Sequence, residues 1–179
     1  MSDRGPGIGD LAPPIELPDT EGTLHTLPMP GEATATVIVW TCNHCPYART
    51  WHDRLMSVAR DYAPQGVRVL HVNSNDAERY PADSPEEMRR RTEDEEWPGP
   101  YLHDETQEAA RAWGAKVTPH VFVLDMDLRL RYEGAPDSDY EDPAQDAAWL
   151  RNALDALLTG GKPEIASTEP VGCSIKWRE

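Results

Sequence analysis

Apolar runs and amphipathic stretches alternate along the chain, and their order predicts an α/β fold. Residues 36–40 form a continuous, largely β-branched run, which is typical of a central strand buried on both faces. Apolar residues then recur at helical spacing through about Tyr62, and residues 64–66 (Pro-Gln-Gly) end this predicted helix. Residues 67–73 are predicted to form a second strand. This order of strand, helix and strand requires a right-handed crossover and a parallel pair.

Two hairpins are predicted outside this unit. Apolar residues alternate over residues 15–27 around an Asp-Thr-Glu-Gly turn, which predicts a short N-terminal hairpin beside the main fold. Residues 121–124 and 128–132 flank the turn at 125–127 and predict an antiparallel hairpin. Adding antiparallel strands to the parallel pair gives a mixed sheet.

Residues 74–100 are polar and acidic, and they are predicted to be an insertion in the fold rather than a separate domain. Within them, Ser84 has the character of a helix cap, while Pro85 and the two glutamates after it resemble an acidic first turn. A short helix is therefore predicted to begin at this point.

Two further helices are expected in the second half of the chain. An acidic start at residues 104–108 and a stop at Gly114 predict one of them. Pro143 is predicted to open the other, an amphipathic helix that runs to about Leu158. Residues 160–179 have little periodicity and are predicted to form a C-terminal tail.

Composition limits the size and the partners of the protein. The 179 residues, 39% of them hydrophobic, are enough for a core, so residues 1–179 are expected to form a single domain. The formal net charge of -15 repels nucleic-acid phosphates and anionic lipid. Residues 1–14 contain no apolar run of signal-peptide length, and no run of ~18 apolar residues occurs. We therefore expect a cytoplasmic protein that binds neither nucleic acid nor membranes.

Cys42 and Cys45 lie where the strand pattern gives way to the helical one, with two residues between them. A thiolate is the nucleophile in disulfide exchange, and a free thiol has a pKa of about 8.5. Cys42 is expected at the start of the helix, where the helix dipole and His44 would favour its anion. Cys45, one turn along, would attack the mixed disulfide and release reduced substrate.

The cysteine pair has two alternative interpretations. It could be half of a zinc site, but only Cys173 and histidines without zinc-ligand spacing remain as a second ligand pair. Two merely buried thiols would be expected on an apolar face, not in a turn between elements. The strand-then-helix context favours redox chemistry, which needs neither a metal nor a dissociable cofactor.

Residues 117–120 (Val-Thr-Pro-His) stand immediately before the strand at 121–124. Pro119 cannot donate a hydrogen bond to a sheet, so it must end or bend the ladder, and an X-Pro bond is where a cis peptide costs least. Together with the cysteine pair, Thr118 and Pro119 form the second candidate feature of the site.

With these residues the chain resembles the thioredoxin superfamily, and more closely its peroxiredoxin-like branch of redoxins with a Cys-x-x-Cys motif. The resemblance spans nearly the whole chain and is carried by residues 12–19, 42–47, 101–107 and 172–177. It implies a thioredoxin-like fold, a central mixed sheet flanked by helices. It also implies that Thr118 and cis-Pro119 lie beside the nucleophilic cysteine and bind the substrate.

Departures from the pattern of these relatives concern three positions. Thr36 stands where thioredoxins keep a buried acid that accepts a proton, and Cys42 replaces the threonine whose hydroxyl helps peroxiredoxins hold peroxide. His44 resembles the corresponding residue of protein disulfide isomerase, which is less reducing than thioredoxin. We therefore expect a couple less reducing than thioredoxin, and weak peroxidase chemistry.

Two more residues are candidates near the site. Trp40, at the end of the central strand, is predicted to wall the site and contact the substrate. Cys173 lies in the tail, and two interpretations stay open for it. It is either a third redox cysteine, which resolves a sulfenic acid or pairs with another chain, or a thiol packed beneath the tail.

These features predict a thiol-disulfide oxidoreductase or antioxidant redoxin. Cys42 attacks, Cys45 resolves, His44 tunes the thiolate, and Thr118 and Pro119 hold the substrate. The expected partners are thiols and disulfides of proteins or small molecules. Two alternatives stay open: a thiol peroxidase in which Cys45 or Cys42 is oxidised by peroxide, and a non-enzymatic zinc-binding or interaction module.

Overall fold

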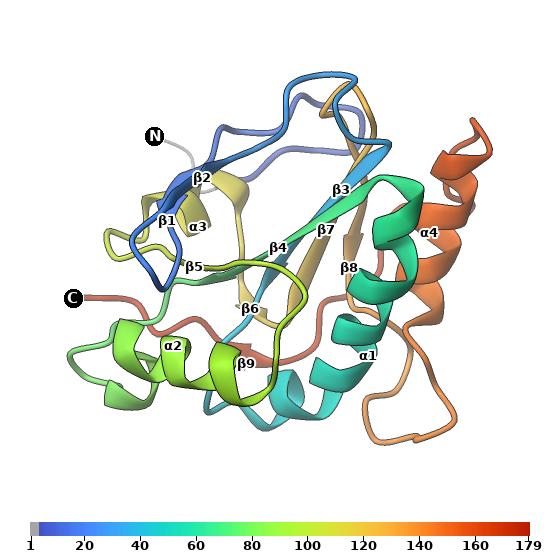
Figure 1. Cartoon of the computed structure of the whole chain (residues 1–179). Coiled ribbons are helices and arrows are strands. Elements are labelled where there is room, and N and C mark those ends of the chain that lie inside the picture. Colours follow the sequence, from blue (N-terminus) through green and yellow to red (C-terminus); the bar gives the residue numbers. More distant parts are fainter. Residues whose placement is uncertain (1–3) are drawn as a thin grey trace.

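A five-stranded mixed sheet forms the centre of the protein (Figure 1). The computed structural model describes residues 4–179, so residues 1–3 of the predicted domain lie outside the described residues. The sheet has the strand order β5-β4-β3-β7-β8, in which β3, β4 and β5 are parallel and β7 is antiparallel to both β3 and β8. Its strands are β3 (Ala35–Trp40), β4 (Val67–Asn73), β5 (Tyr101–His103), β7 (His120–Leu124) and β8 (Leu130–Gly134).

β3 occupies the middle of the sheet and is buried along its whole length, as its unbroken apolar run predicts. Val37 and Val39 face the helices α1 (Pro46–Tyr62) and α4 (Ala148–Leu158). Ile38 and Trp40 face the opposite side, where α3 (Glu108–Trp113) packs. Two apolar layers therefore enclose β3, and its carboxyl end leads directly into the cysteine motif.

The predicted hairpins and the first helix are confirmed. β1 (Glu16–Pro18) and β2 (Leu24–Thr26) pair antiparallel at the N-terminus, and β7 with β8 forms the second hairpin. The 3-10 helix η1 (Ala63–Gln65) follows α1, and Gly66 ends it with a φ of 84°, which glycine adopts without strain.

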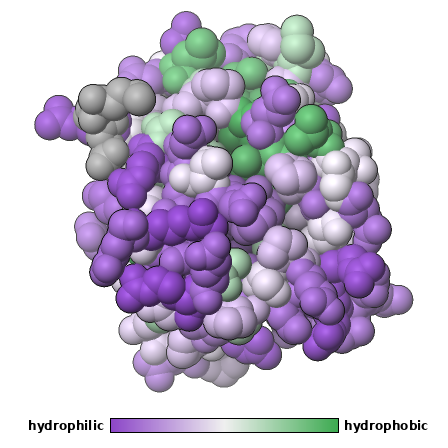
Figure 2. All heavy atoms as spheres, turned by 90° about the vertical axis from the view of Figure 1, so that its left-hand side faces the viewer, coloured by the Kyte–Doolittle hydropathy of each residue, from purple (hydrophilic) through white to green (hydrophobic). Residues whose placement is uncertain are grey.

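The segment 74–100 contains a short helix where one was predicted. The 3-10 helix η2 (Pro81–Asp83) leads into α2 (Pro85–Asp94). The Ser84 hydroxyl accepts a hydrogen bond from the Glu87 N–H group at 3.2 Å, which is an N-cap. In Figure 1, α2 lies next to the C-terminal part of the chain, and Figure 2 shows that this side of the molecule is predominantly hydrophilic.

Two helices begin later than predicted. α3 starts at Glu108 rather than at residue 104, because residues 104–107 form a turn whose Asp104 carboxylate accepts the Ala110 N–H group at 3.0 Å. α4 starts at Ala148 and not at Pro143. Ala147 before it has a φ of 56°, and its N–H group donates to Asp137 at 2.9 Å. Buried carboxylates that precede the two helices, Asp104 and Asp137, thus hold the backbone at both helix starts.

The tail at 160–179 crosses back over the body of the protein. β9 (Cys173–Ser174) pairs antiparallel with β6 (Val117–Thr118), the segment just before Pro119. The tail therefore reaches the same end of the sheet as the cysteine motif. Among residues 4–179, the helices are all too short or too polar to span a membrane.

Candidate active site

Cys42 and Cys45 are buried in the loop between β3 and α1, with 1% and 0% of their surfaces exposed. The helix begins at Pro46, and Cys45 is its N-cap residue. The expectation that Cys42 lies where the helix begins is therefore wrong. The unpaired N–H groups and the positive end of the helix dipole act on Cys45 instead.

Thr118 contacts both sulfur atoms, and the Thr118–Pro119 peptide bond is cis, as the resemblance implies. The Thr118 hydroxyl lies 3.3 Å from Cys42 Sγ. When Cys45 carries a proton, it donates to the Thr118 carbonyl oxygen, also at 3.3 Å. The two features that the sequence suggests separately thus form one site at the end of the sheet.

The two thiols of the pair hydrogen-bond to each other, and this contact shifts their pKa values in opposite directions. A hydrogen bond from Cys42 lowers the pKa of Cys45 to about 4; burial opposes this effect, and hydrogen bonds from Cys173, the Ala48 N–H group and Thr118 support it. The hydrogen bond between the two thiols, followed by burial, raises the pKa of Cys42. At neutral pH the pair therefore carries one negative charge, mainly on Cys45.

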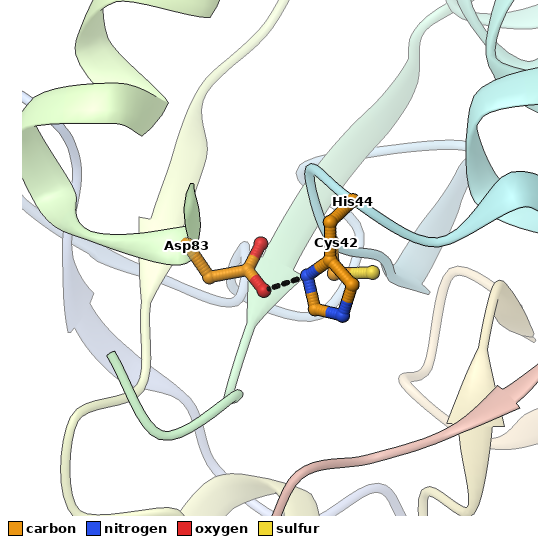
Figure 3. A group of neighbouring side chains, drawn as sticks. All are labelled: Cys42, His44 and Asp83. Atoms are coloured by element: carbon orange, nitrogen blue, oxygen red, sulfur yellow. Dashed lines mark ion pairs between the residues drawn. The ribbon is translucent and has the colours of Figure 1, made fainter. Parts of the chain in front are cut away.

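The His44 ring lies beside Cys42 and faces a carboxylate that sequence reasoning missed. Its Nδ1 atom lies 2.5 Å from Oδ2 of Asp83, at the end of η2, and Figure 3 shows Cys42 beside this pair. The ring also stacks on Tyr80, with 5.5 Å between the centroids. Asp83 lies in the polar segment 74–100, where an acidic residue before a helix cap gives no local indication of a role.

Asp83 is completely buried, and three further donors hold its carboxylate. Oδ1 accepts the Asn43 N–H group at 2.6 Å and the Asn73 side chain at 3.1 Å, while Oδ2 accepts the Asn75 side chain at 3.1 Å. Hydrogen bonds of this kind stabilise a buried negative charge. That charge raises the pKa of Cys42 further, after the hydrogen bond to Cys45 and burial.

The segment 74–100 also fixes the backbone of the cysteine loop. Arg91 of α2 donates to the Cys42 carbonyl oxygen and to Asn43 Oδ1, each at 3.1 Å. Tyr101 of β5 donates to the same Asn43 oxygen at 2.8 Å. Segments far from the cysteines in sequence therefore hold the loop in one conformation.

Cys42, His44 and Asp83 are the residues best placed to hold a metal ion. One sulfur, one ring nitrogen and one carboxylate oxygen lie within 4.8 Å of one another. Sulfur and imidazole ligands suit zinc. The Asp83 oxygens, however, already accept three hydrogen bonds. A zinc ion would thus compete with the hydrogen bonds that hold Asp83. Its ligands would include only one cysteine, whereas the zinc site considered from the sequence uses both Cys42 and Cys45.

Trp40 does not reach the site, contrary to its predicted role. Its ring is fully buried on the α3 side of the sheet, 5.6 Å from that of Trp113 and 5.5 Å from that of Phe122. The indole N–H group donates to Ser74 at 2.9 Å. Trp40 therefore supports the strand that leads to Cys42, and a substrate cannot contact it in this conformation.

Thr36 and Cys173 are the remaining residues that the sequence analysis singles out near the site. Thr36 is buried in β3, and its hydroxyl has no hydrogen-bond partner within residues 4–179, so it does not replace the acid of thioredoxins. Cys173 is partly exposed and packs against Cys42, Cys45 and Ala48. The tail thus brings a third thiol to the pair.

The fold and the buried cysteine pair define a thioredoxin-like redoxin with a Cys-x-x-Cys motif. The chain belongs to the AhpC/TSA family, whose model matches residues 8–133. This match and the similarity to solved structures confirm the predicted superfamily, its peroxiredoxin-like branch and the mixed α/β fold.

Three relatives illustrate the similarity. An uncharacterized conserved protein from Geobacillus kaustophilus is 40% identical, with a TM-score of 0.91 over 96% of this chain and 93% of that chain. The methylamine utilization protein MauD from Paracoccus denitrificans is 25% identical over 177 residues, which cover 98% of this chain and 76% of MauD. Peroxidoxin BcpB from Mycobacterium tuberculosis, 17% identical, has the same fold, with a TM-score of 0.64 over 87% of this chain and 97% of that chain.

Proposed function

We propose that the protein is a thiol-disulfide oxidoreductase in which Cys42 and Cys45 alternate between a dithiol and a disulfide. The observation that carries this proposal is the contact of the two buried sulfurs with each other, and the hydrogen bond between them holds the pKa of Cys45 well below its usual range. Both sulfurs contact Thr118, next to the cis peptide bond. Within this proposal, Thr118 and Pro119 form the surface against which a substrate sulfur is placed.

The difference between the two sulfurs supports Cys42 as the atom that bonds to the substrate. In the oxidised protein, an incoming thiolate attacks Cys42, the bond between Cys42 and Cys45 breaks, and Cys45 leaves with the electron pair. A thiol of low pKa is the better leaving group, and Cys45 is that thiol. A second substrate thiolate then attacks the mixed disulfide at the substrate sulfur. Substrate disulfide and reduced protein are the products.

The same asymmetry supports an oxidising role. A stabilised thiolate on Cys45 stabilises the reduced protein, as in the strong oxidant DsbA. The hydrogen bonds to Cys45 also lessen the need for a buried acid at position 36, because they favour the Cys45 thiolate. The proposed substrates are dithiols of proteins or small molecules, from which the pair accepts two electrons.

Equilibration with glutathione redox buffers tests this proposal. The Cys173→Ser variant isolates the pair, and we expect one disulfide per chain and a reduction potential at least about 40 mV less negative than the ~-270 mV of thioredoxin. The fraction oxidised is read by alkylation and mass spectrometry, with Cys42→Ser/Cys173→Ser as the control that cannot form the disulfide. A potential near that of thioredoxin would refute the oxidising role, and a pair that never closes would refute the function itself.

A thiol peroxidase is the second candidate, and the Cys45 thiolate favours it. The Thr118 hydroxyl hydrogen-bonds this thiolate. It thereby supplies a hydrogen-bond donor near Cys42, which stands where peroxiredoxins have the threonine that helps hold peroxide. Saturable peroxide consumption with a sulfenic acid trapped on Cys45 would support this activity. Inertness to peroxide in a protein that exchanges disulfides would exclude it.

A further inference from the structure

The C-terminal strap, defined here as residues 171–176, crosses the cysteine pair and brings a third thiol to it. Cys173 lies opposite Thr118 in the pairing of β9 with β6. Its side chain packs on the cluster that contains Cys42 and Cys45, and its thiol hydrogen-bonds to Cys45. Cys45 therefore contacts two other thiols, one on its own loop and one on the strap.

The strap is held in place on both sides of Cys173. A side chain at position 172 would collide with the Thr118 carbonyl oxygen, because a Cβ atom on Gly172 would lie 2.1 Å from it. The Ile175 N–H group donates to the Lys116 carbonyl oxygen at 3.2 Å, and upstream the Thr168 N–H group donates to the carbonyl oxygen of Glu133 in β8 at 3.1 Å. These contacts hold Cys173 at the pair without a covalent bond, which gives it a high effective concentration there.

We propose that Cys45 exchanges its disulfide partner between Cys42 and Cys173, so that the strap is part of the redox couple; this inference rests on the proposed function. The Cys173 thiolate attacks the Cys45 sulfur of the disulfide between Cys42 and Cys45. A bond between Cys45 and Cys173 forms and the old bond breaks. Cys42 leaves as a thiolate and takes up the proton that Cys173 released. The chain keeps one disulfide, so no external oxidant or reductant is consumed.

This exchange moves a reactive sulfur toward the surface. Cys42 and Cys45 are buried, whereas Cys173 is partly exposed. A substrate thiolate can then attack Cys173, and Cys45 leaves with the electron pair. The strap thus gives bulky thiols, such as those of folded proteins, a point of entry that the buried pair lacks.

The state of Cys173 predicts how the exchange depends on pH. Burial and the hydrogen bond to Cys45 raise the pKa of Cys173 to about 11. In the oxidised protein Cys45 carries no thiolate, so burial alone raises that pKa; the attacking thiolate is still a minor species at neutral pH, and its amount grows about tenfold for each pH unit below the pKa. Exchange in the oxidised wild-type protein should accelerate accordingly between pH 7 and 9.

The Cys42→Ser variant provides the direct test, because its only cysteines are Cys45 and Cys173. After reaction with glutathione disulfide under native conditions, we expect a loss of both free thiols in one monomer. Mass spectrometry of the tryptic digest should show the peptide 5–49 linked to the peptide 152–176. Closure should be at least about tenfold faster than in urea, where the chain between the cysteines is an open loop.

Two further samples separate this inference from the proposed function. Cys173→Ser should still close the disulfide between Cys42 and Cys45; if it does while Cys42→Ser binds glutathione without closing, the inference fails and the function stands. If Cys173→Ser forms no disulfide, the proposed function fails. The same exchange is also measured in oxidised wild-type protein, which contains no substitution that could disturb folding. Alkylation at pH 9 should label Cys42 as well as Cys173, and labelling of Cys173 alone would overturn the exchange.

Discussion

At the scale of single residues, Asp83 sets the charge around the cysteine pair. Its buried carboxylate faces His44 at 2.5 Å and accepts three hydrogen bonds from asparagine groups. Interactions between charges strengthen where water is excluded, so this carboxylate opposes a thiolate on Cys42. Asp83 therefore helps to keep the negative charge of the pair on Cys45, the sulfur that leaves during exchange.

Asp83→Asn is expected to make Cys42 more reactive. Without the negative charge, the pKa of Cys42 falls, and its alkylation by iodoacetamide at neutral pH should accelerate by about tenfold, equivalent to ~1.4 kcal/mol. The rate is measured against pH in a Cys45→Ser/Cys173→Ser background, where Cys42 is the only thiol. The amide also replaces an acceptor with a donor, which costs about 1–3 kcal/mol of stability.

Asp137→Asn in the same background is the matched control for that loss of stability. Asp137 is also buried, but it binds Arg54 and Trp51 beside α1, away from the sulfurs. Its replacement should destabilise the protein and leave the alkylation profile of Cys42 unchanged. If both variants shift the profile equally, loosening of the fold explains the effect and the charge of Asp83 does not.

At the scale of elements, η2 and α2 of the segment 74–100 support the site. η2 brings Asp83 to His44, and α2 brings Arg91 to the cysteine loop. The sequence predicts the helix, because Ser84 and Pro85 are local start signals. It does not predict these contacts, because they join residues about 40 to 50 positions apart through buried polar groups, which no local pattern encodes.

Among the other elements, the sequence predicts the long strands correctly and misses short strands and the helix boundaries that tertiary contacts determine. β3 and β4, with six and seven residues, are long enough to be placed correctly, whereas β5, with only three residues, is not predicted. The start of α4 depends on a hydrogen bond to Asp137, which the proline at 143 cannot reveal. Local signals thus identify the layers of the fold but not all of their boundaries.

At the site, the sequence predicts which residues come together but not where every side chain points. Cys42, Cys45, Thr118 and Pro119 are predicted from spacing and resemblance, and the structure brings them together. Trp40 is misplaced because alternation in a strand buried on both faces does not reveal which side the site is on. Recognition of the motif therefore succeeds, while the direction of a side chain needs the three-dimensional fold.

At the scale of the whole molecule, a buried histidine couples stability to pH. His71 of β4 is completely buried, and neither of its ring nitrogens has a hydrogen-bond partner among the described residues. Burial, with the nearby His52 and Arg91, lowers its pKa to about 3. Burial and Arg91 also lower the pKa of His52 to about 4, although Glu95 opposes this.

We expect the free energy of unfolding to fall as the pH drops below about 6.5. Each histidine binds a proton less readily in the folded than in the unfolded chain. Its contribution to the free energy of unfolding is therefore complete above the pKa of the unfolded chain, and it is lost as the pH falls toward the pKa of the folded protein. Between about pH 6 and 4, each contributes up to ~1.4 kcal/mol per pH unit. Urea unfolding at several pH values measures this slope.

His71→Phe should flatten that slope, because it removes one titrating group and keeps an aromatic ring beside Trp97. His25→Gln is the control, since His25 is a partly exposed histidine in the N-terminal hairpin, with its Nε2 atom 2.7 Å from Asp19. An unchanged slope in His71→Phe, or an equal change in His25→Gln, would contradict the assignment of acid sensitivity to the buried histidine.

In the proposed exchange, Cys42 bonds to the substrate while Cys45 breaks or resolves that bond, and a comparison of two trapping variants tests these roles most directly. Both are made with Cys173→Ser and exposed to glutathione disulfide, and the glutathionylated cysteine is identified by mass spectrometry. We predict that Cys45→Ser accumulates a persistent mixed disulfide on Cys42, which wild-type protein resolves. Accumulation on Cys45 in the Cys42→Ser variant, with Cys42 of the other variant remaining a free thiol, would contradict it.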